Sequence, residues 1–160
     1  MKRLMMLAMA AVMLVGLLSA CGSKKSETVD ADLDEFYDDL EDSYGWDDNY
    51  LVDIEGEMLE SYYPGLADIE TEQFVAKTPM MSATVNEMVF LQCKTEEDAV
   101  KAGAILQDRI DAQADGGAWY PESMEAWSKG TVIQQGTYVA MIASAEHQDE
   151  IAEKFNALFA

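Results

Sequence analysis

The sequence predicts an α+β domain: a four-stranded antiparallel sheet with helices on one face, built from a strand-strand-helix unit that occurs twice. Two observations predict it. Two pairs of short segments rich in β-branched, aromatic and methionine side chains are each joined by a turn, which is typical of hairpins. Each pair is followed by a segment with apolar residues at helical spacing, and such an apolar face can pack on a sheet.

An acidic helical segment, residues 30–63, precedes the sheet. Residues 27–60 contain fifteen acidic side chains and no lysine or arginine. The apolar spacing over 31–43 predicts an amphipathic helix with Asp30 as its N-cap, and the pattern over 53–62 predicts a second, shorter helix. We expect both helices at an edge of the sheet or partly free of it.

Strands and helices follow one another in the rest of the chain. Residues 73–81 and 86–94 predict the first hairpin. Thr95 and Asp98 form a capping box, which begins a helix that continues to about residue 114. Small residues in the middle of its inner stripe favour close packing on the sheet. The remaining elements are a short helix over 122–128, strands over 131–134 and 137–144, and a final helix over 146–158.

The N-terminal residues have the pattern of a lipoprotein signal peptide. Basic residues precede an apolar run over 4–17 that is too short to span a bilayer. Leu18, Ser19 and Ala20 fit a lipobox, and Cys21 supplies the thiol that receives a diacylglyceryl group. The pattern predicts a signal peptide over 1–20, the lipid-modified cysteine and a flexible tether over 21–29, and a single domain over 30–160.

The charge of the chain limits its partners. Cleavage after residue 20 removes Lys2 and Arg3, which leaves 8 basic and 31 acidic side chains and a formal charge of −23. Such a surface repels phosphates, so we expect no nucleic acid partner. We expect contact with the outer, extracytoplasmic face of the cell membrane through the lipid anchor at Cys21.

Catalytic motifs are scarce. Cys93 lies in an apolar run and is expected to be a core thiol, whereas His147, the single histidine, is expected to be exposed to solvent. The sequence has no Cys/His cluster, no nucleophile elbow and no glycine-rich phosphate loop. These features favour a protein that is not an enzyme, and we expect no cofactor.

Two groups of residues are weaker candidates for binding sites. Trp119, Tyr120 and Trp127 either line a groove for a sugar or peptide or form a packed corner. Acidic residues also fall at positions 1, 3, 5, 9 and 12 of a calcium-loop pattern, namely Asp30, Asp32, Asp34, Asp38 and Glu41. Position 6 of that pattern holds Glu35 where the loop needs glycine, and a helix explains the same residues.

The chain resembles the small, uncharacterised lipoproteins of Gram-positive anaerobes that share a domain of unknown function. The resemblance covers roughly residues 50–145. It rests on the lipobox ending in Cys21, the segment Phe74–Met81, Asn86-Glu87 before an apolar strand, Tyr120-Pro121, and Gly136-Thr137-Tyr138-Val139. The resemblance implies a membrane-anchored extracellular domain, and it carries no activity or site residues that can be transferred.

Together these features predict a lipid-anchored, non-enzymatic binding or accessory module of the cell envelope, whose partner is an envelope protein or a small ligand. Two alternatives stay open. One is an envelope hydrolase that uses a pair of carboxylates, and the other is an acidic lipoprotein that binds divalent cations.

Overall fold

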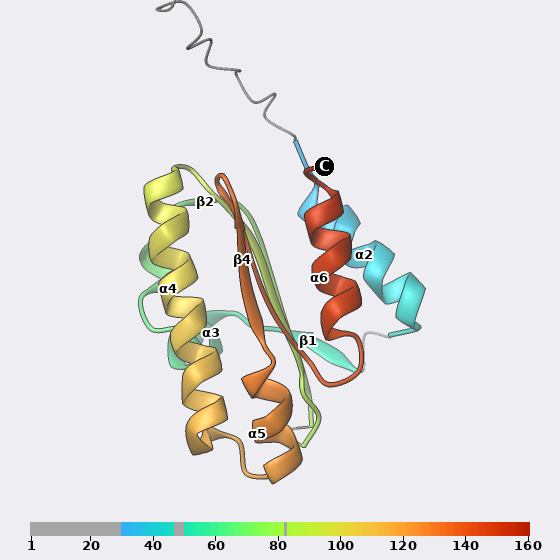
Figure 1. Ribbon diagram of the computed structural model, residues 1–160. Helices are drawn as coiled ribbons and strands as arrows, with labels where there is room; N and C mark the ends of the chain where they lie inside the picture. Colours follow the sequence, from blue (N-terminus) through green and yellow to red (C-terminus); the bar gives the residue numbers. More distant parts are fainter. Residues whose placement is uncertain (1–29, 47–49, 82) are drawn as a thin grey trace, which may run out of the picture.

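A five-stranded antiparallel sheet lies between two layers of helices (Figure 1). The computed structural model describes residues 30–46, 50–81 and 83–160. One face of the sheet carries α3 (Gly56–Tyr62), α4 (Glu96–Ala112) and α5 (Pro121–Ser128), and the other carries α2 (Leu33–Tyr44) and α6 (Gln148–Ala157). None of the helices in these ranges is long and apolar enough to cross a membrane.

The predicted hairpins form the centre of the sheet. The strand order is β1-β2-β3-β5-β4, with β1 (Leu51–Asp53), β2 (Thr71–Pro79), β3 (Asn86–Cys93), β4 (Thr131–Gln135) and β5 (Tyr138–Ser144). The hairpins β2–β3 and β4–β5 meet where β3 pairs with β5, from Asn86 opposite Ser144 to Gln92 opposite Tyr138. The α+β class is therefore confirmed.

The prediction of four strands was wrong by one edge strand. Residues Leu51–Asp53 form β1, which pairs with the end of β2, for example Val52 with Thr78. A strand of three residues is too short to show the alternation that identifies a strand in sequence. The short turns of helix η1 (Leu66–Asp68) and η2 (Gln113–Gly117) complete the connections.

Helix α4 begins as the sequence predicts. The Thr95 hydroxyl accepts a hydrogen bond from the Asp98 backbone N–H at 3.1 Å and donates one to Asp98 Oδ2 at 2.8 Å. Gly103 faces the sheet, and a Cβ added there would lie 3.7 Å from a methyl carbon of Val132. The small residue thus lets the helix approach the sheet closely.

The prediction of helices on one face was also wrong. Helix α2 and the final helix α6 together cover the second face, where Phe36 and Phe155 both contact Phe90, with ring centroids 5.1 and 5.9 Å away. Leu33 and Leu40 on α2 are fully buried. The acidic helix is therefore part of the core, with its acids on the outer side.

The composition of β3 and β5 explains why helices cover both faces of the sheet. Every residue of β5 is buried, and so is every residue of β3 except Gln92. A strand with one face in water alternates apolar and polar residues, whereas a strand covered on both faces is a continuous apolar run. The run Met88-Val89-Phe90-Leu91 is of the second kind, and it requires a helix on each side.

We expect Asp32→Ala to lower the free energy of unfolding by about 1 kcal/mol. Asp32, and not Asp30 as the sequence suggested, is the N-cap of α2, and its Oδ1 accepts hydrogen bonds from the N–H groups of Asp34 and Glu35 at 3.1 and 3.0 Å. Urea unfolding with and without millimolar calcium measures the effect. A loss that appears only with calcium would instead identify Asp32 as a metal ligand.

Candidate ligand pocket

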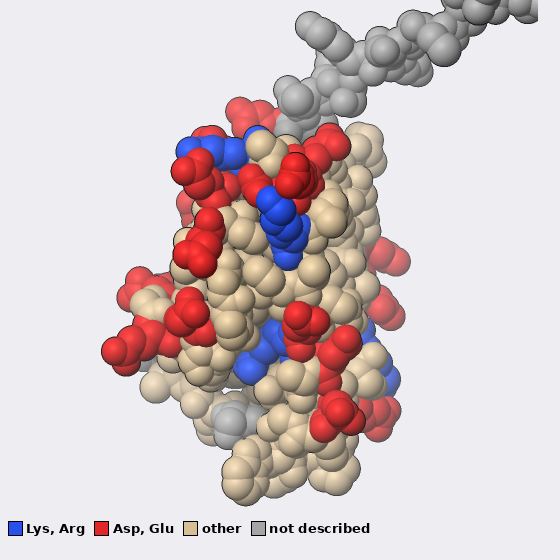
Figure 2. Space-filling model, turned by 90° about the vertical axis from the view of Figure 1, so that its left-hand side faces the viewer, with Lys and Arg blue, Asp and Glu red and all other residues tan. Residues whose placement is uncertain are grey.

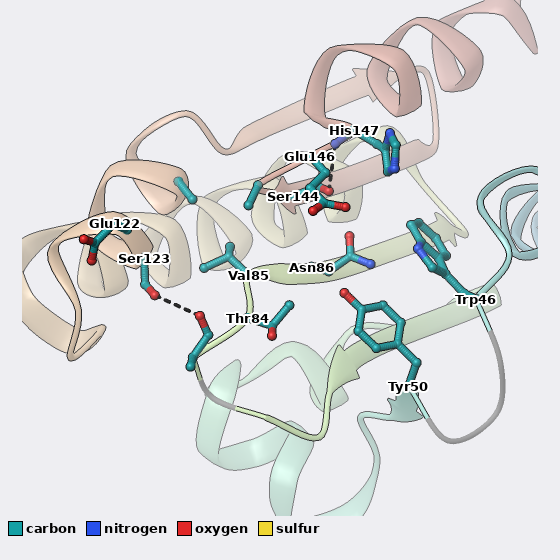
Figure 3. Close-up of a pocket in the computed structure, with 13 residues that line it drawn as sticks. Trp46, Tyr50, Thr84, Val85, Asn86, Glu122, Ser123, Ser144, Glu146 and His147 are labelled. Atoms are coloured by element: carbon teal, nitrogen blue, oxygen red, sulfur yellow. Dashed lines mark hydrogen bonds between the residues drawn. The ribbon is translucent and has the colours of Figure 1, made fainter.

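A half-enclosed pocket of about 270 Å³ lies at the end of the sheet where β3 begins and β5 ends. Four segments that are distant in sequence form its walls (Figure 3). They contribute Trp46 and Tyr50 after α2, residues 83–86 before and at the start of β3, Glu122, Ser123 and Ala126 in the first turns of α5, and residues 144–147 between β5 and α6.

Asn86 supplies a hydrogen-bond acceptor that has no partner in the described part of the chain. The residue is 3% exposed, and its Oδ1 is buried and accepts no hydrogen bond. Its side chain lies between Tyr50 and the segment 144–147 (Figure 3). A buried acceptor without a partner costs about 1–3 kcal/mol, so this oxygen is suited to receive an N–H or O–H group from a ligand.

Aromatic stacking positions His147 at the pocket. The imidazole stacks on Tyr44 with ring centroids 4.0 Å apart, and Tyr44 in turn lies 5.1 Å from Trp46. His147 Nδ1 lies 3.6 Å from Glu150 Oε2 and is buried without a closer polar partner among the described residues. The exposed histidine predicted from sequence is thus half-buried, because α2 brings Tyr44 over it.

Hydrogen bonds hold the pocket walls in place. Ser123 Oγ donates to the carbonyl of Ala83 at 3.2 Å, which joins α5 to the segment before β3. The backbone N–H of Ala145 donates to the carbonyl of Val85 at 2.9 Å. Gln148 Oε1 accepts from the N–H of Ser144 at 3.0 Å. The pocket is therefore shaped by the fold before any ligand arrives.

The charged side chains of the pocket are acidic. Glu122 and Glu146 line it, and none of the described lining residues is a lysine or arginine. The pKa of Tyr50 is raised, first by burial and then by the negative charge of Glu146, while a hydrogen bond donated by the Asn86 side-chain amide N–H opposes the shift. A neutral phenol, an amide and a carboxylate at one pocket fit a ligand that donates hydrogen bonds.

A second polar cluster lies inside the core, between the sheet and α4. Glu87 on β3 has a side chain only 4% exposed, and Arg109 on α4 binds it through two nitrogens: Nε at 2.9 Å from Oε1 and Nη2 at 3.0 Å from Oε2. Tyr63 Oη donates to Oε1 at 2.6 Å, and Thr78 Oγ1 donates to Oε2 at 3.1 Å. Both carboxylate oxygens are fully used within the fold.

The same cluster holds its cation between aromatic rings. The Arg109 guanidinium lies 4.0 Å from the centre of the Tyr62 ring and 5.2 Å from that of Trp127. Burial works against the charge, but the hydrogen bonds and negative charge of Glu87 outweigh it and raise the pKa of Arg109. Burial and Glu87 also raise the pKa of Tyr63 well above its usual value. This closed arrangement serves the core and offers no free group to a ligand.

The comparison with protein families matches residues 44–144 to DUF4358, a domain of unknown function. The chain belongs to this family. The matched span runs from the last residue of α2 to the last residue of β5, so the DUF4358 span contains the whole sheet and the α3, α4 and α5 layer. The rest of the second helical layer lies outside it. Searches of curated proteins and of solved structures found no match.

The three aromatic residues predicted as a ligand groove do not lie together on one surface of the DUF4358 domain. Trp127 is buried in the core beside Arg109, whereas Trp119 is 91% exposed and Tyr120 is 53% exposed. None of the three lines the pocket. The three residues therefore form neither a common groove nor a common packed corner. Trp119 and Tyr120 precede α5 in the chain, whereas Trp127 lies on the inner side of that helix.

The acidic residues of the calcium-loop pattern lie on or just before α2, so a helix takes the place of a loop. Asp34, Asp38 and Glu41 line a groove that also holds Lys77, whose Nζ is 2.9 Å from Asp53 Oδ1. Within the described ranges, no three His, Cys, Asp or Glu side chains lie where they could hold one metal ion. Seen from the α4 side, acids are scattered over the surface with few basic groups (Figure 2).

The remaining predicted residues divide into two groups. Leu18, Ser19, Ala20 and Cys21 lie outside the residues that the structure describes. Cys93 is 1% exposed and belongs to the core between the sheet and α4, and burial raises the pKa of its thiol to about 11. The core position predicted for Cys93 is thus confirmed.

Sequence reasoning missed the residues that form the pocket. Trp46, Tyr50, Asn86, Ser123 and His147 come from separate segments and share no spacing. Asn86 offered one signal, because it directly precedes the apolar run of β3, and a polar residue that is buried there needs a hydrogen-bond partner.

Proposed function

We propose that the protein is a lipid-anchored, non-enzymatic binding module on the outer face of the cytoplasmic membrane, and that its pocket takes a small ligand. The observation that carries the proposal is the half-enclosed pocket with the unpaired, buried acceptor of Asn86. Such pockets, concave and with a few polar groups at fixed positions, are typical of small-molecule sites. The resemblance to lipoproteins of Gram-positive bacteria and the lipobox ending in Cys21 support the location.

The position of the pocket supports access from outside the cell. The backbone N–H of Ala31 bonds Tyr138 Oη at 3.2 Å, so the described chain begins where β5 starts (Figure 1). Ser144, at the other end of β5, lines the pocket. Six residue steps along a strand span about 20 Å. If a tether over 21–29 holds the Asp30 end toward the membrane, the pocket faces away from it.

The test of the anchor compares the full chain with Cys21→Ala in the producing cell. We expect the wild-type chain to incorporate labelled fatty acid and to fractionate with membranes. Cys21→Ala is expected to lose both properties, because the thiol that accepts the diacylglyceryl group is gone. Equal membrane association of the two proteins would contradict the anchor.

The test of the pocket uses Ala145→Trp, which places a large side chain at an exposed lining position. Ala104→Trp, at an exposed position on α4 away from the pocket, is the matched control. Each protein is purified gently from membranes, and the small molecules that accompany it are extracted and identified by mass spectrometry. We expect a compound with the wild type and with Ala104→Trp, and none with Ala145→Trp. Turnover of a cell-wall or peptide substrate by the purified protein would overturn the non-enzymatic assignment.

A further inference from the structure

We propose that the ligand of this pocket is a small organic amine in its protonated form, with at least one N–H group and an apolar body. The inference rests on the proposed function, since it names the chemical class that the same pocket takes. Three observations support it: the charge around the pocket, the chemistry of the buried acceptor and the aromatic walls.

The charge around the pocket favours a cation. Glu122 and Glu146 line it, and Asp149 and Glu150 lie in the adjoining groove in the first turn of α6. The one lysine of that groove, Lys129, is paired with Glu125 at 2.9 Å. Two carboxylates therefore line the pocket and two more line the adjoining groove, and no unpaired lysine or arginine lies among the described groups that line the two cavities.

The positive ends of two helix dipoles reduce the negative potential at the pocket but do not reverse its sign. Both α5 and α6 begin at the pocket, and neither has a side-chain cap. Each helix end is equivalent to roughly half a positive charge, which gives about one unit for the pair. Four carboxylates outweigh that value, and Glu122, Asp149 and Glu150 are themselves the first-turn acids that complement the two dipoles. An anionic ligand is thus disfavoured.

The buried acceptor favours cations that carry an N–H group. Asn86 Oδ1 accepts hydrogen bonds and cannot donate one, and it has no partner among the described residues. A protonated primary or secondary amine supplies the missing donor. A quaternary ammonium has the same charge but no N–H, so it would leave the acceptor unpaired.

The walls suit the rest of the ligand. Trp46 and Tyr50 present aromatic rings beside the acceptor (Figure 3), and such rings attract a cation over their faces as well as apolar groups. The volume of about 270 Å³ is small for a ligand site. A compact amine with one ring or a short chain therefore fits better than an extended peptide.

Four matched probes test the inference on the full chain purified in detergent: benzylamine, benzyltrimethylammonium, benzyl alcohol and phenylacetate. They share one ring and differ in charge and in N–H or O–H donors. Calorimetry is expected to give benzylamine a dissociation constant about tenfold lower than those of benzyltrimethylammonium and benzyl alcohol, since one missing hydrogen bond or ion pair is worth about that factor. Phenylacetate is expected not to bind.

Single-residue variants test which side chains cause the preference for benzylamine. Glu146→Gln removes an exposed charge from the rim and is expected to weaken benzylamine about three- to tenfold at low salt. Glu153→Gln, exposed on α6 and away from the pocket, is the control and should change nothing. Asn86→Ala is expected to abolish the preference for benzylamine over benzyltrimethylammonium. If Asn86→Ala does not fold, the probe series and Glu146→Gln still decide the question.

Several results would overturn the amine class. Equal affinity for all four probes would show apolar binding alone, and tighter binding of phenylacetate would show an anion site at the helix ends. If no probe binds while Ala145→Trp still abolishes recovery of the native small molecule, the binding function stands and the amine class fails. If Ala145→Trp has no effect either, both proposals fail.

Discussion

Arg109→Ala is expected to lower the free energy of unfolding by about 3–5 kcal/mol, because it leaves a buried carboxylate without its counter-ion. The Glu87 side chain is 4% exposed and accepts two hydrogen bonds from Arg109. Tyr63 and Thr78 also donate to it, but neither supplies a positive charge. Chemical unfolding monitored by tryptophan fluorescence and by far-UV circular dichroism measures the loss.

A second variant tests the physical cause. Glu87→Gln in the Arg109→Ala background removes the unpaired charge while keeping one side-chain oxygen as an acceptor for Tyr63 or Thr78, so it should recover part of the lost stability. Lys101→Ala, at an exposed ion pair on the same helix, should change little. A small effect of Arg109→Ala, similar to that of Lys101→Ala, would contradict the role of the buried pair.

Phe155→Ala is expected to lower the free energy of unfolding by about 3–5 kcal/mol, the usual cost of removing a buried aromatic ring. Phe155 is fully buried and contacts Phe36 on α2 at 5.9 Å, Phe90 on β3 at 5.9 Å and Phe159 at 5.4 Å between ring centroids. Its loss leaves a cavity where the two helices of the second layer meet the sheet. The midpoint of urea unfolding gives the effect.

Val100→Ala provides the control, because Val100 is an apolar side chain on α4 that is 61% exposed. It should leave the midpoint nearly unchanged. If Phe155→Ala were equally mild, α2 and α6 would be accessory to the domain. The expected large effect would instead make the second layer essential, although all of it except Tyr44 lies outside the DUF4358 span of 44–144.

Local signals in the sequence predicted most of the helices and both hairpins. The Thr95 and Asp98 capping box marked the start of α4, and the spacing of Leu33, Phe36 and Leu40 marked α2. These signals succeed because capping and amphipathic spacing depend on residues within a few positions of one another. The strand β1 has only three residues, which is too few for such a pattern.

The pairing of Glu87 with Arg109 could have been inferred in part. Arg109 is the one arginine beyond residue 3, and it lies on a helix predicted to pack on the sheet, while Glu87 is an acid at the start of an apolar strand. Buried charges require partners, so two such residues are expected to meet. The two aromatic rings around Arg109 had no such signal, because Tyr62 and Trp127 come from helices on either side of it in sequence.

The sequence by itself determined the α+β class, the hairpins, the capped helix α4 and the core position of Cys93, since each depends on neighbouring residues or on a continuous apolar run. It also provides the pattern that predicts a lipid anchor at Cys21. Only the tertiary structure decided that helices cover both faces and that Asn86, Tyr50 and His147 meet at one pocket. Those contacts join residues far apart in the chain, and their geometry is set by how whole helices and strands pack together.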